Sequence, residues 1–247
     1  MLEIVKHKHF FKRKEIWFGD RPFDVDGVDE VVFRSCKENI QLDGFQTEVF
    51  TTMVIDLNND VEYIWQNMDF SMQKAIKRAI REGITVRLNE DHENFYRLNC
   101  LFRQQKGEAI TVADVEFMKK YGPLFTAYFE NRLLAGQFYL EDAENIRGLA
   151  SASLRLQADE DIAGLVGRAN RLLYWEAIKY AKQKGIKVFD MGGYYTGEKK
   201  DEQKEGINQF KKKFGGQIVT HYIHQKYYSV WYSLMKKIYV YFKRIKS

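Results

Sequence analysis

The stretch Ala169–Tyr194 reads ANRLLYWEAIKYAKQKGIKVFDMGGY and decides the fold. Its first part predicts a helix, because Leu173, Ala177 and Ala181 fall at i, i+4 and i+8 and so share one face. Gly185 is placed to end this helix, since glycine readily adopts the left-handed conformation of a helix C-terminus. A short apolar run and two glycines follow, which indicates a buried strand that ends in a turn.

Three strand-like runs precede this helix, and short polar turns separate them. They are Leu124–Glu130, Leu133–Leu140 and Ile146–Leu156. Such spacing is typical of antiparallel hairpins. The helix then leads to the strand Ile186–Met191, and a helical crossover between two neighbouring strands makes them parallel. We therefore expect a mixed α+β fold, with a mostly antiparallel sheet, one parallel strand pair and flanking helices.

The remaining segments fit the same class of fold. The first 60 residues look extended, with strand-like runs at Glu30–Arg34 and Val49–Leu57. Ser71–Glu82 predicts an amphipathic helix capped by Ser71, with five apolar side chains facing inward. These are Met72, Ala75, Ile76, Ala79 and Ile80. A helix over 207–214, a strand over 217–224 and an aromatic helix from Tyr227 complete the chain.

The composition excludes several classes of protein. The 247 residues are 45% hydrophobic and include two prolines, which rules out a disordered or collagen-like chain. Two cysteines argue against a disulfide framework, and no run approaches the length of a membrane span. We expect a soluble, cytoplasmic protein. The histidine pairs His7/His9 and His221/His224 lack the partners of a metal motif, so we expect no metal site.

Positive charge is concentrated near the C-terminus. Residues 206–247 contain nine Lys or Arg and no Asp or Glu, although the whole chain carries only +5. A basic tail on an acidic body favours a polyanionic partner, such as nucleic acid, a phosphorylated substrate or an anionic membrane surface.

Two groups of residues near the predicted helix and strand are candidates for binding. Gly167, Arg168 and Asn170 lie at the predicted helix start, where free N–H groups and a guanidinium could hold phosphate. An ordinary N-cap with a solvated arginine is the simpler interpretation. Asp190 ends the buried strand, where it either accepts hydrogen bonds from the following loop or contacts substrate.

The segment EGINQFKKKFGG (Glu205–Gly216) presents a third group. Ile207, Phe210 and Phe214 predict a packing face, and the lysines at 211–213 point away from it. A lysine run is usually solvated. A lysine held close to Asp190 and the two glycines could instead stabilise negative charge on a carbonyl oxygen.

Taken in order, four segments resemble the FemABX family of peptidoglycan-bridge aminoacyltransferases, which have the GNAT acyltransferase fold. They are FTTMVIDL (Phe50–Leu57), SMQKAIKRAIREGITV (Ser71–Val86), Ala169–Tyr194 and GINQFKKKFGG (Gly206–Gly216). The resemblance implies transfer of an acyl or aminoacyl group from acyl-CoA or aminoacyl-tRNA to an amine. The acceptor would be an envelope precursor or a small molecule.

The resemblance also implies roles for single residues. Lys211 occupies the place of the family lysine that is associated with the tetrahedral intermediate. Asp190 is a candidate base, and the helix start around Gly167, Arg168 and Asn170 corresponds to the region near the phosphates of the donor. Gly164 stands where the acyl-CoA signature has Gln or Arg.

We predict three segments. They are an extended remnant of a first GNAT-like half at 1–58, a GNAT-like acyltransferase domain at 59–225, and a basic aromatic helix at 226–247. The helix could pack on the domain, or it could lie at the inner face of an anionic membrane with its aromatic stripe toward the lipid. The stripe comprises Tyr228, Trp231, Met235, Ile238, Tyr239 and Phe242. Two alternatives to an enzyme are a non-catalytic GNAT-like module that binds an anionic surface and an RNA-binding protein.

Overall fold

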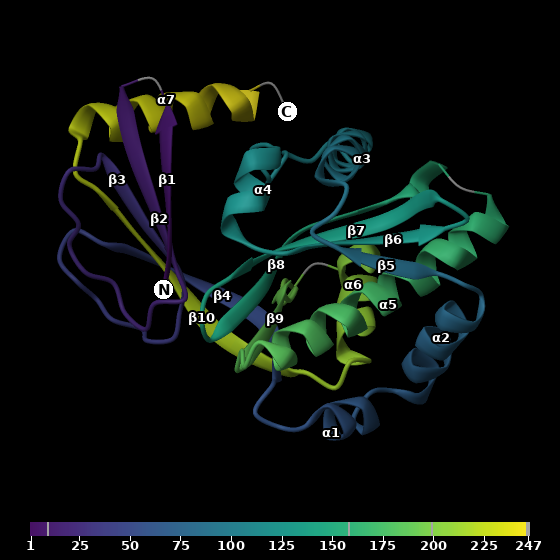
Figure 1. The fold of residues 1–247 in the computed structure, drawn as a ribbon. Helices are drawn as coiled ribbons and strands as arrows, with labels where there is room; N and C mark the ends of the chain where they lie inside the picture. The colour runs from purple at the N-terminus through teal and green to yellow at the C-terminus, as the bar shows by residue number, and fades with distance from the viewer. Residues whose placement is uncertain (9, 158, 199, 246–247) are drawn as a thin grey trace. The chain divides into compact units, whose positions relative to one another are not determined.

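The computed structural model describes residues 1–8, 10–157, 159–198 and 200–245 (Figure 1). The chain forms two compact units. One comprises Met1–Thr52 and Val219–Ser247, and the other comprises Met53–Ile218. Two strands, β4 (Gln46–Asp56) and β10 (Gln217–Tyr227), begin in one unit and end in the other. The division at residues 58 and 225 stays a prediction.

The unit that contains both ends of the chain is built on strands β1 (Leu2–Lys8), β2 (Phe11–Trp17), β3 (Glu30–Cys36) and β10. β1 pairs with β2 and β3 pairs with β10 in antiparallel fashion, whereas β2 and β3 are parallel. A small apolar cluster lies on this sheet. Its buried members are Ile16, Val31, Phe33 and Cys36. The last helix, α7 (Val230–Ile245), completes the unit.

The central unit contains strands in the order β4-β9-β8-β7-β6-β5. Their bounds are β5 (Thr85–Leu88), β6 (Leu124–Phe129), β7 (Arg132–Glu141), β8 (Asn145–Ser153) and β9 (Val188–Gly193). β5 to β8 form an antiparallel meander, and β8 pairs with β9 in parallel. The predicted meander and the predicted parallel pair are therefore confirmed.

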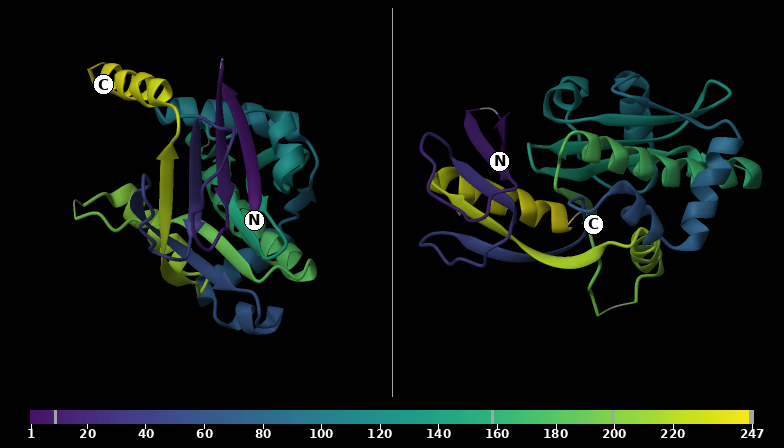
Figure 2. Two further views of the ribbon diagram at one scale, coloured as in Figure 1. Left: turned by 90° about the vertical axis from the view of Figure 1, so that its left-hand side faces the viewer. Right: turned by 60° about the horizontal axis from the view of Figure 1, so that its bottom comes forward.

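Helices cover both faces of this central sheet (Figures 1 and 2). α3 (His92–Gln105) and α4 (Val115–Tyr121) lie on one face, and α5 (Glu160–Gln183) lies on the other. α1 (Val61–Gln66), α2 (Phe70–Arg81), the short 3-10 helix η1 (Leu154–Gln157) and α6 (Glu202–Lys212) complete the unit. No helix in the described ranges is both long and apolar enough to cross a bilayer.

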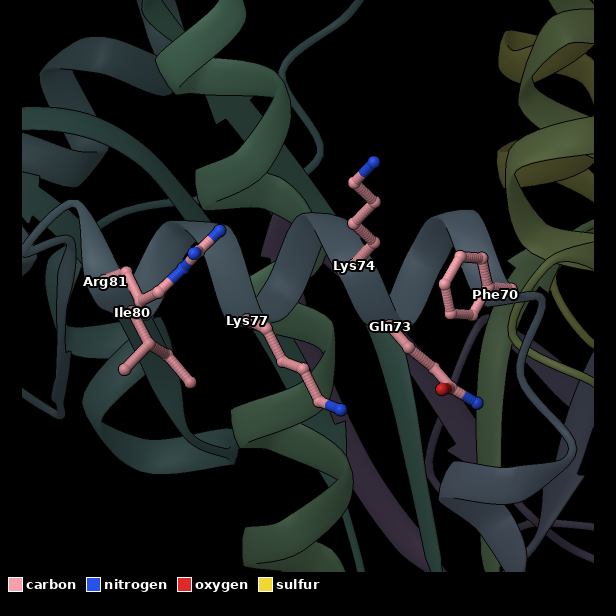
Figure 3. Close-up of a pocket in the computed structure, with 6 residues that line it drawn as sticks. All are labelled: Phe70, Gln73, Lys74, Lys77, Ile80 and Arg81. Atoms are coloured by element: carbon pink, nitrogen blue, oxygen red, sulfur yellow. The ribbon is translucent and has the colours of Figure 1, made fainter.

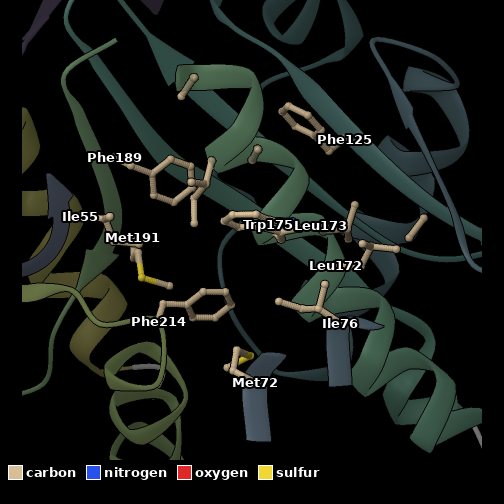
Figure 4. Packing of buried hydrophobic residues seen from close by; sticks show 14 of the residues in the cluster. Ile55, Met72, Ile76, Phe125, Leu172, Leu173, Trp175, Phe189, Met191 and Phe214 are labelled. Atoms are coloured by element: carbon tan, nitrogen blue, oxygen red, sulfur yellow. The ribbon is translucent and has the colours of Figure 1, made fainter. Parts of the chain in front are cut away.

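The main hydrophobic core lies between α2, α5 and the sheet (Figure 4). α2 contributes Met72 and Ile76, α5 contributes Leu172 and Leu173, and β9 contributes Phe189, all of them buried. Burying one such side chain contributes about 1.5–3 kcal/mol to folding, so this cluster fixes α5 against the strands.

The start of α5 differs from the prediction. The helix begins at Glu160, ten residues before the expected cap at Asn170, and the Asp159 side chain accepts a hydrogen bond from the Ile162 N–H. Two glycines lower the helix propensity of this first part. Burial of Val166 and Ala169 against the core outweighs that cost.

α2 also differs in two details. Its cap is Asp69, which accepts a hydrogen bond from the Ser71 N–H, so Ser71 is not the cap. Met72, Ile76 and Ala79 are buried as expected, but the Ile80 side chain is 56% exposed. An apolar residue on the outer face of a helix is a feature that core packing does not explain.

Candidate active site

Strands β8 and β9 separate shortly after they begin to pair. Their parallel register ends at Arg147↔Asp190, and β8 continues to Ser153. A β-bulge falls at the same point, because Tyr139 on β7 pairs with Gly148 whereas Phe138 pairs with Ala150. A bulge bends its strand. The two strands thus diverge from Asp190, and Lys211 binds the carbonyls of Gly192 and Gly193 just after it.

Lys211 lies inside the protein at this divergence. Its side chain comes from α6, the residue is only 6% exposed, and its Nζ donates to the carbonyls of Gly192 (3.0 Å) and Gly193 (2.6 Å). A charged lysine has three N–H donors, so one remains for another acceptor. The expectation that lysines 211–213 all lie on a solvated face is wrong for Lys211, whereas Lys212 and Lys213 are exposed.

Burial changes the acid–base behaviour of Lys211. Desolvation lowers the pKa of its ammonium from 10.5 to about 8, although the nearby Asp190 carboxylate opposes this effect. The Arg147 guanidinium lowers the pKa further. The group therefore titrates close to physiological pH, in the range where perturbed residues often take part in catalysis.

Asp190 links the strand to the turn that holds Lys211. It is 3% exposed, one carboxylate oxygen forms an ion pair with Arg147, and the other accepts from the Gly192 N–H at 2.7 Å. Gly192 has φ +83°, a left-handed conformation that glycine adopts without strain. Asp190 thus stabilises the turn whose carbonyls accept from Lys211.

The orientation of α6 explains the burial of Lys211. Asn208, one turn earlier, is buried because its side chain donates to the Tyr195 carbonyl (2.8 Å) and accepts from the Tyr195 N–H (3.0 Å). Asn208 and Lys211 therefore face inward together with Phe214. Ile207, predicted to pack, is 44% exposed. The apolar periodicity predicted that Ile207 faces inward, but the polar residues Asn208 and Lys211 face inward instead.

The other predicted group lies elsewhere. Gly167, Arg168 and Asn170 occupy the second and third turns of α5 and are not at a helix N-terminus, so their backbone offers no free N–H groups there. Arg168 Nε forms an ion pair with Glu82 at 2.5 Å, and the Asn170 side-chain oxygen has no hydrogen-bond partner. Their donor-binding role stays a prediction, without its helix-start argument.

Arg147 and Asn208 are site residues that sequence reasoning missed. An arginine inside the strand-like run Ile146–Leu156 was the available signal, since a buried arginine needs an acidic partner. Asn208 offered no comparable signal. Within the described ranges, no group of three His, Cys, Asp or Glu side chains could hold a metal ion. His9, of the predicted histidine pair, lies outside the described residues.

The FemAB family model matches residues 126–230, from within β6 to the end of β10, with α5 and α6 between them. Over this segment the chain is similar to the FemAB family. Among the curated proteins, none matches it. The segment matched contains Arg147, Asp190 and Lys211, so the candidate site belongs to the FemAB-like part of the chain.

Solved structures share the fold at low sequence identity. FemX superposes with a TM-score of 0.62 at 13% identity, over 90% of this chain and 83% of that chain. The C-terminal domain of a candidate lysylphosphatidylglycerol synthetase from Agrobacterium fabrum gives 0.57 at 11%, over 91% and 83%. L-PGS from Bacillus licheniformis gives 0.53 at 14%, over 90% and 81%. The predicted mixed α+β fold with a mostly antiparallel sheet is confirmed, but β2 and β3 form a further parallel pair besides β8 and β9, where one pair was expected.

Proposed function

We propose that this protein transfers an acyl or aminoacyl group from an ester to the amine of an envelope precursor. The observation that carries the proposal is Lys211, a buried ammonium that is held by two carbonyls and has one donor left. It lies where β8 and β9 diverge, within the FemAB-like segment. The likeness to FemX and to the lysylphosphatidylglycerol synthetase domain supports peptidoglycan precursors or lipids as acceptors.

The proposed reaction needs one nucleophile and one oxyanion site. The acceptor amine attacks the donor carbonyl carbon, a C–N bond forms, and the carbonyl oxygen gains negative charge. The third N–H of Lys211 and a β8 backbone N–H within Ala150–Ser153 stabilise that charge. The ester C–O bond then breaks, the leaving oxygen takes the electron pair, and the proton lost by the amine neutralises it.

Asp190 acts in this proposal as a positioning residue. Both of its oxygens already have partners, Arg147 and the Gly192 N–H, so neither is directed at an incoming amine. Glu198, the next carboxylate along the chain, is exposed. The leaving group therefore serves as the proton acceptor.

We further propose aminoacyl-tRNA as the donor. Acyl-CoA enzymes of the GNAT fold hold pyrophosphate at a helix start, and here the start of α5 carries three carboxylates. These are Asp159, Glu160 and Asp161. Negative charges beside a helix N-terminus compete with a bound phosphate. Gly164, which stands where the acyl-CoA signature has Gln or Arg, also argues against acyl-CoA as the donor.

A second proposal concerns location. α7 carries an exposed apolar stripe that comprises Val230, Trp231, Leu234, Met235 and Ile238. On another face, Tyr232 and Lys236 bind the buried Glu30 and hold the helix on its unit. Tyr228 donates to Asp24 and so lies outside the stripe, and the side chains of Tyr239 and Phe242 lie outside the described residues. We propose that α7 holds the enzyme at the inner face of an anionic membrane.

Two experiments test these proposals. Purified protein is offered aminoacyl-tRNA or acyl-CoA with peptide-stem and lipid amines, and product is measured by mass spectrometry. We expect product from aminoacyl-tRNA alone, and lack of any product would contradict the enzyme proposal.

For α7, Trp231→Ser with Leu234→Ser should abolish sedimentation with anionic vesicles. Point substitutions are preferable to removal of the whole segment after Gln225, because Lys226 and Tyr227 belong to β10 and pair with β3.

A further inference from the structure

The outer face of α2 is basic. Lys74, Lys77 and Arg81 are exposed and form no ion pair with any described residue. Other exposed lysines of the same unit do pair with acids, such as Lys119 with Glu116 at 2.9 Å. Figure 3 shows the three cations along α2 together with Phe70, Gln73 and Ile80. These six residues line a hollow of about 530 Å³.

Arginines on α2 and α5 extend this positively charged surface. Arg78 of α2 and Arg168 of α5 share the single carboxylate of Glu82. Arg171, one turn further along α5, has no acidic partner among the described residues, and its Nη1 donates to the Gly167 carbonyl. Burial lowers the pKa of Arg171, and the charges of Arg155 and Arg168 lower it further. Such crowding of like charges favours a bound anion.

We infer that these side chains form a docking surface for the phosphate backbone of RNA. This basic band comprises Lys74, Lys77, Arg78, Arg81, Arg155, Arg168 and Arg171. The inference rests on the proposed function and assigns the tRNA donor a place on the protein. Cations recur at every turn of α2, about 5–6 Å apart along the helix, so they can contact successive phosphates of one strand.

The position of the band relative to Lys211 supports this inference. The Arg171 guanidinium lies 5.5 Å from the centre of the Phe210 ring on α6. Phe210 directly precedes Lys211 in the sequence. An RNA strand that follows the band from α2 over α5 thus reaches α6, the helix that carries Lys211 of the proposed oxyanion site.

The apolar side chains of α2 favour RNA over a membrane. Phe70 is 77% exposed and Ile80 is 56% exposed, but ten residues separate them, about 15 Å along the helix, with cations between. An interfacial helix needs a continuous apolar face, as α7 has and α2 lacks. An isolated exposed ring next to lysines instead suits stacking against an unpaired base.

The test measures equilibrium binding of uncharged tRNA by fluorescence anisotropy as a function of salt. The variant is K74Q/K77Q/R81Q, and the control K119Q/K184Q/K187Q removes three charges that pair with Glu116, Glu141 and Glu144. We expect the band variant to bind tRNA at least tenfold more weakly. Its log–log salt slope should fall by about one per cation removed. The control should bind as the unaltered protein does.

Each alternative outcome is decisive. Equal loss of binding in both variants, or tRNA binding retained by the band variant, would overturn the inference. Loss of anionic-vesicle binding by the band variant, with tRNA binding unchanged, would assign α2 to a membrane instead. Binding needs no turnover. A protein that binds tRNA through the band and transfers nothing would contradict the proposed function alone.

Discussion

Helices α5 and α6 each carry a group of residues that the sequence predicts as part of a site, and the two groups lie in different surroundings in the structure. On α6, Lys211 lies inside the protein with its ammonium on two glycine carbonyls. On α5, Gly167, Arg168 and Asn170 lie two turns inside the helix. A predicted site that depends on a helix boundary is easily wrong, because the observed boundary can lie several turns from the predicted one. A candidate that depends on side-chain chemistry survives a shift in helix phase.

The largest effect is expected from Lys211→Ala. Loss of one oxyanion donor typically lowers kcat by about 10²–10³-fold, and we expect a loss of that size in transfer to an amine acceptor. The substitution should also lower stability, because Lys211 is buried. Two carbonyls lose their donor, so the free energy of unfolding should fall by about 1–3 kcal/mol. Denaturant titration measures the stability.

Lys212→Ala and Lys213→Ala are the matched controls for Lys211→Ala. Both side chains are exposed and belong to the same run, so each should change stability by no more than about 0.5 kcal/mol. Equal rate losses at all three positions would remove the distinction between Lys211 and its neighbours.

Asp190→Asn should produce the next largest effect. The substitution leaves the Arg147 guanidinium buried without its carboxylate, which typically costs about 3–5 kcal/mol of stability. Because Asp190 is proposed to position the Gly192 turn, the double variant Arg147→Met/Asp190→Asn should regain stability without regaining the rate. Full recovery of kcat in that variant would show that Asp190 has no positioning role.

The sequence predicted the central sheet well for a physical reason. β6 to β9 are apolar runs separated by turn residues, and the helix between β8 and β9 leaves only a crossover as the connection. The positions of these strands are determined by burial, and the pattern of apolar residues in the sequence indicates which segments are buried. The same pattern placed the buried face of α2 at Met72, Ile76 and Ala79.

The features that the sequence missed depend on polar contacts between distant residues. The phase of α6 follows from the two hydrogen bonds between Asn208 and Tyr195, which no periodicity reveals. The buried pair Arg147–Asp190 joins residues 43 positions apart. The early start of α5 needs Val166 and Ala169 in the core to outweigh two glycines. Each case requires tertiary structure.

The pH profile tests the protonation state of Lys211. Its pKa of about 8 lies below the ordinary value of 10.5, so the ammonium persists only below about pH 8 in the folded protein. If the charged form stabilises the oxyanion, kcat should fall about tenfold per pH unit above 8. The assay should use an acceptor amine that is already neutral at pH 7, because its own titration would otherwise change the rate in the same pH range. A rate that rises through pH 8 would make Lys211 a base.

The same titration predicts how stability depends on pH. Between about pH 8 and 10.5 the unfolded chain holds a proton on Lys211 that the folded chain has lost. Stability should therefore rise with pH across that window relative to Lys211→Met, which cannot titrate. A difference between the two proteins that stays constant with pH would mean that the pKa is not lowered.

The smallest expected effect belongs to α5 and tests the other side of the comparison. Arg168→Ala removes one phosphate contact of the proposed basic band and one partner of Glu82, which keeps Arg78. A partly exposed ion pair contributes at most about 1 kcal/mol, so stability should change little. tRNA binding should weaken less than tenfold, and its salt slope should fall by about one, because the lost contact is electrostatic. Arg168→Lys keeps the charge and should restore the slope. If Arg168→Ala instead abolished tRNA binding, or weakened it equally at all salt concentrations, α5 would hold a specific donor contact. The predicted donor role of Arg168 would then stand on its own chemistry, even though the helix start on which it was argued lies two turns away.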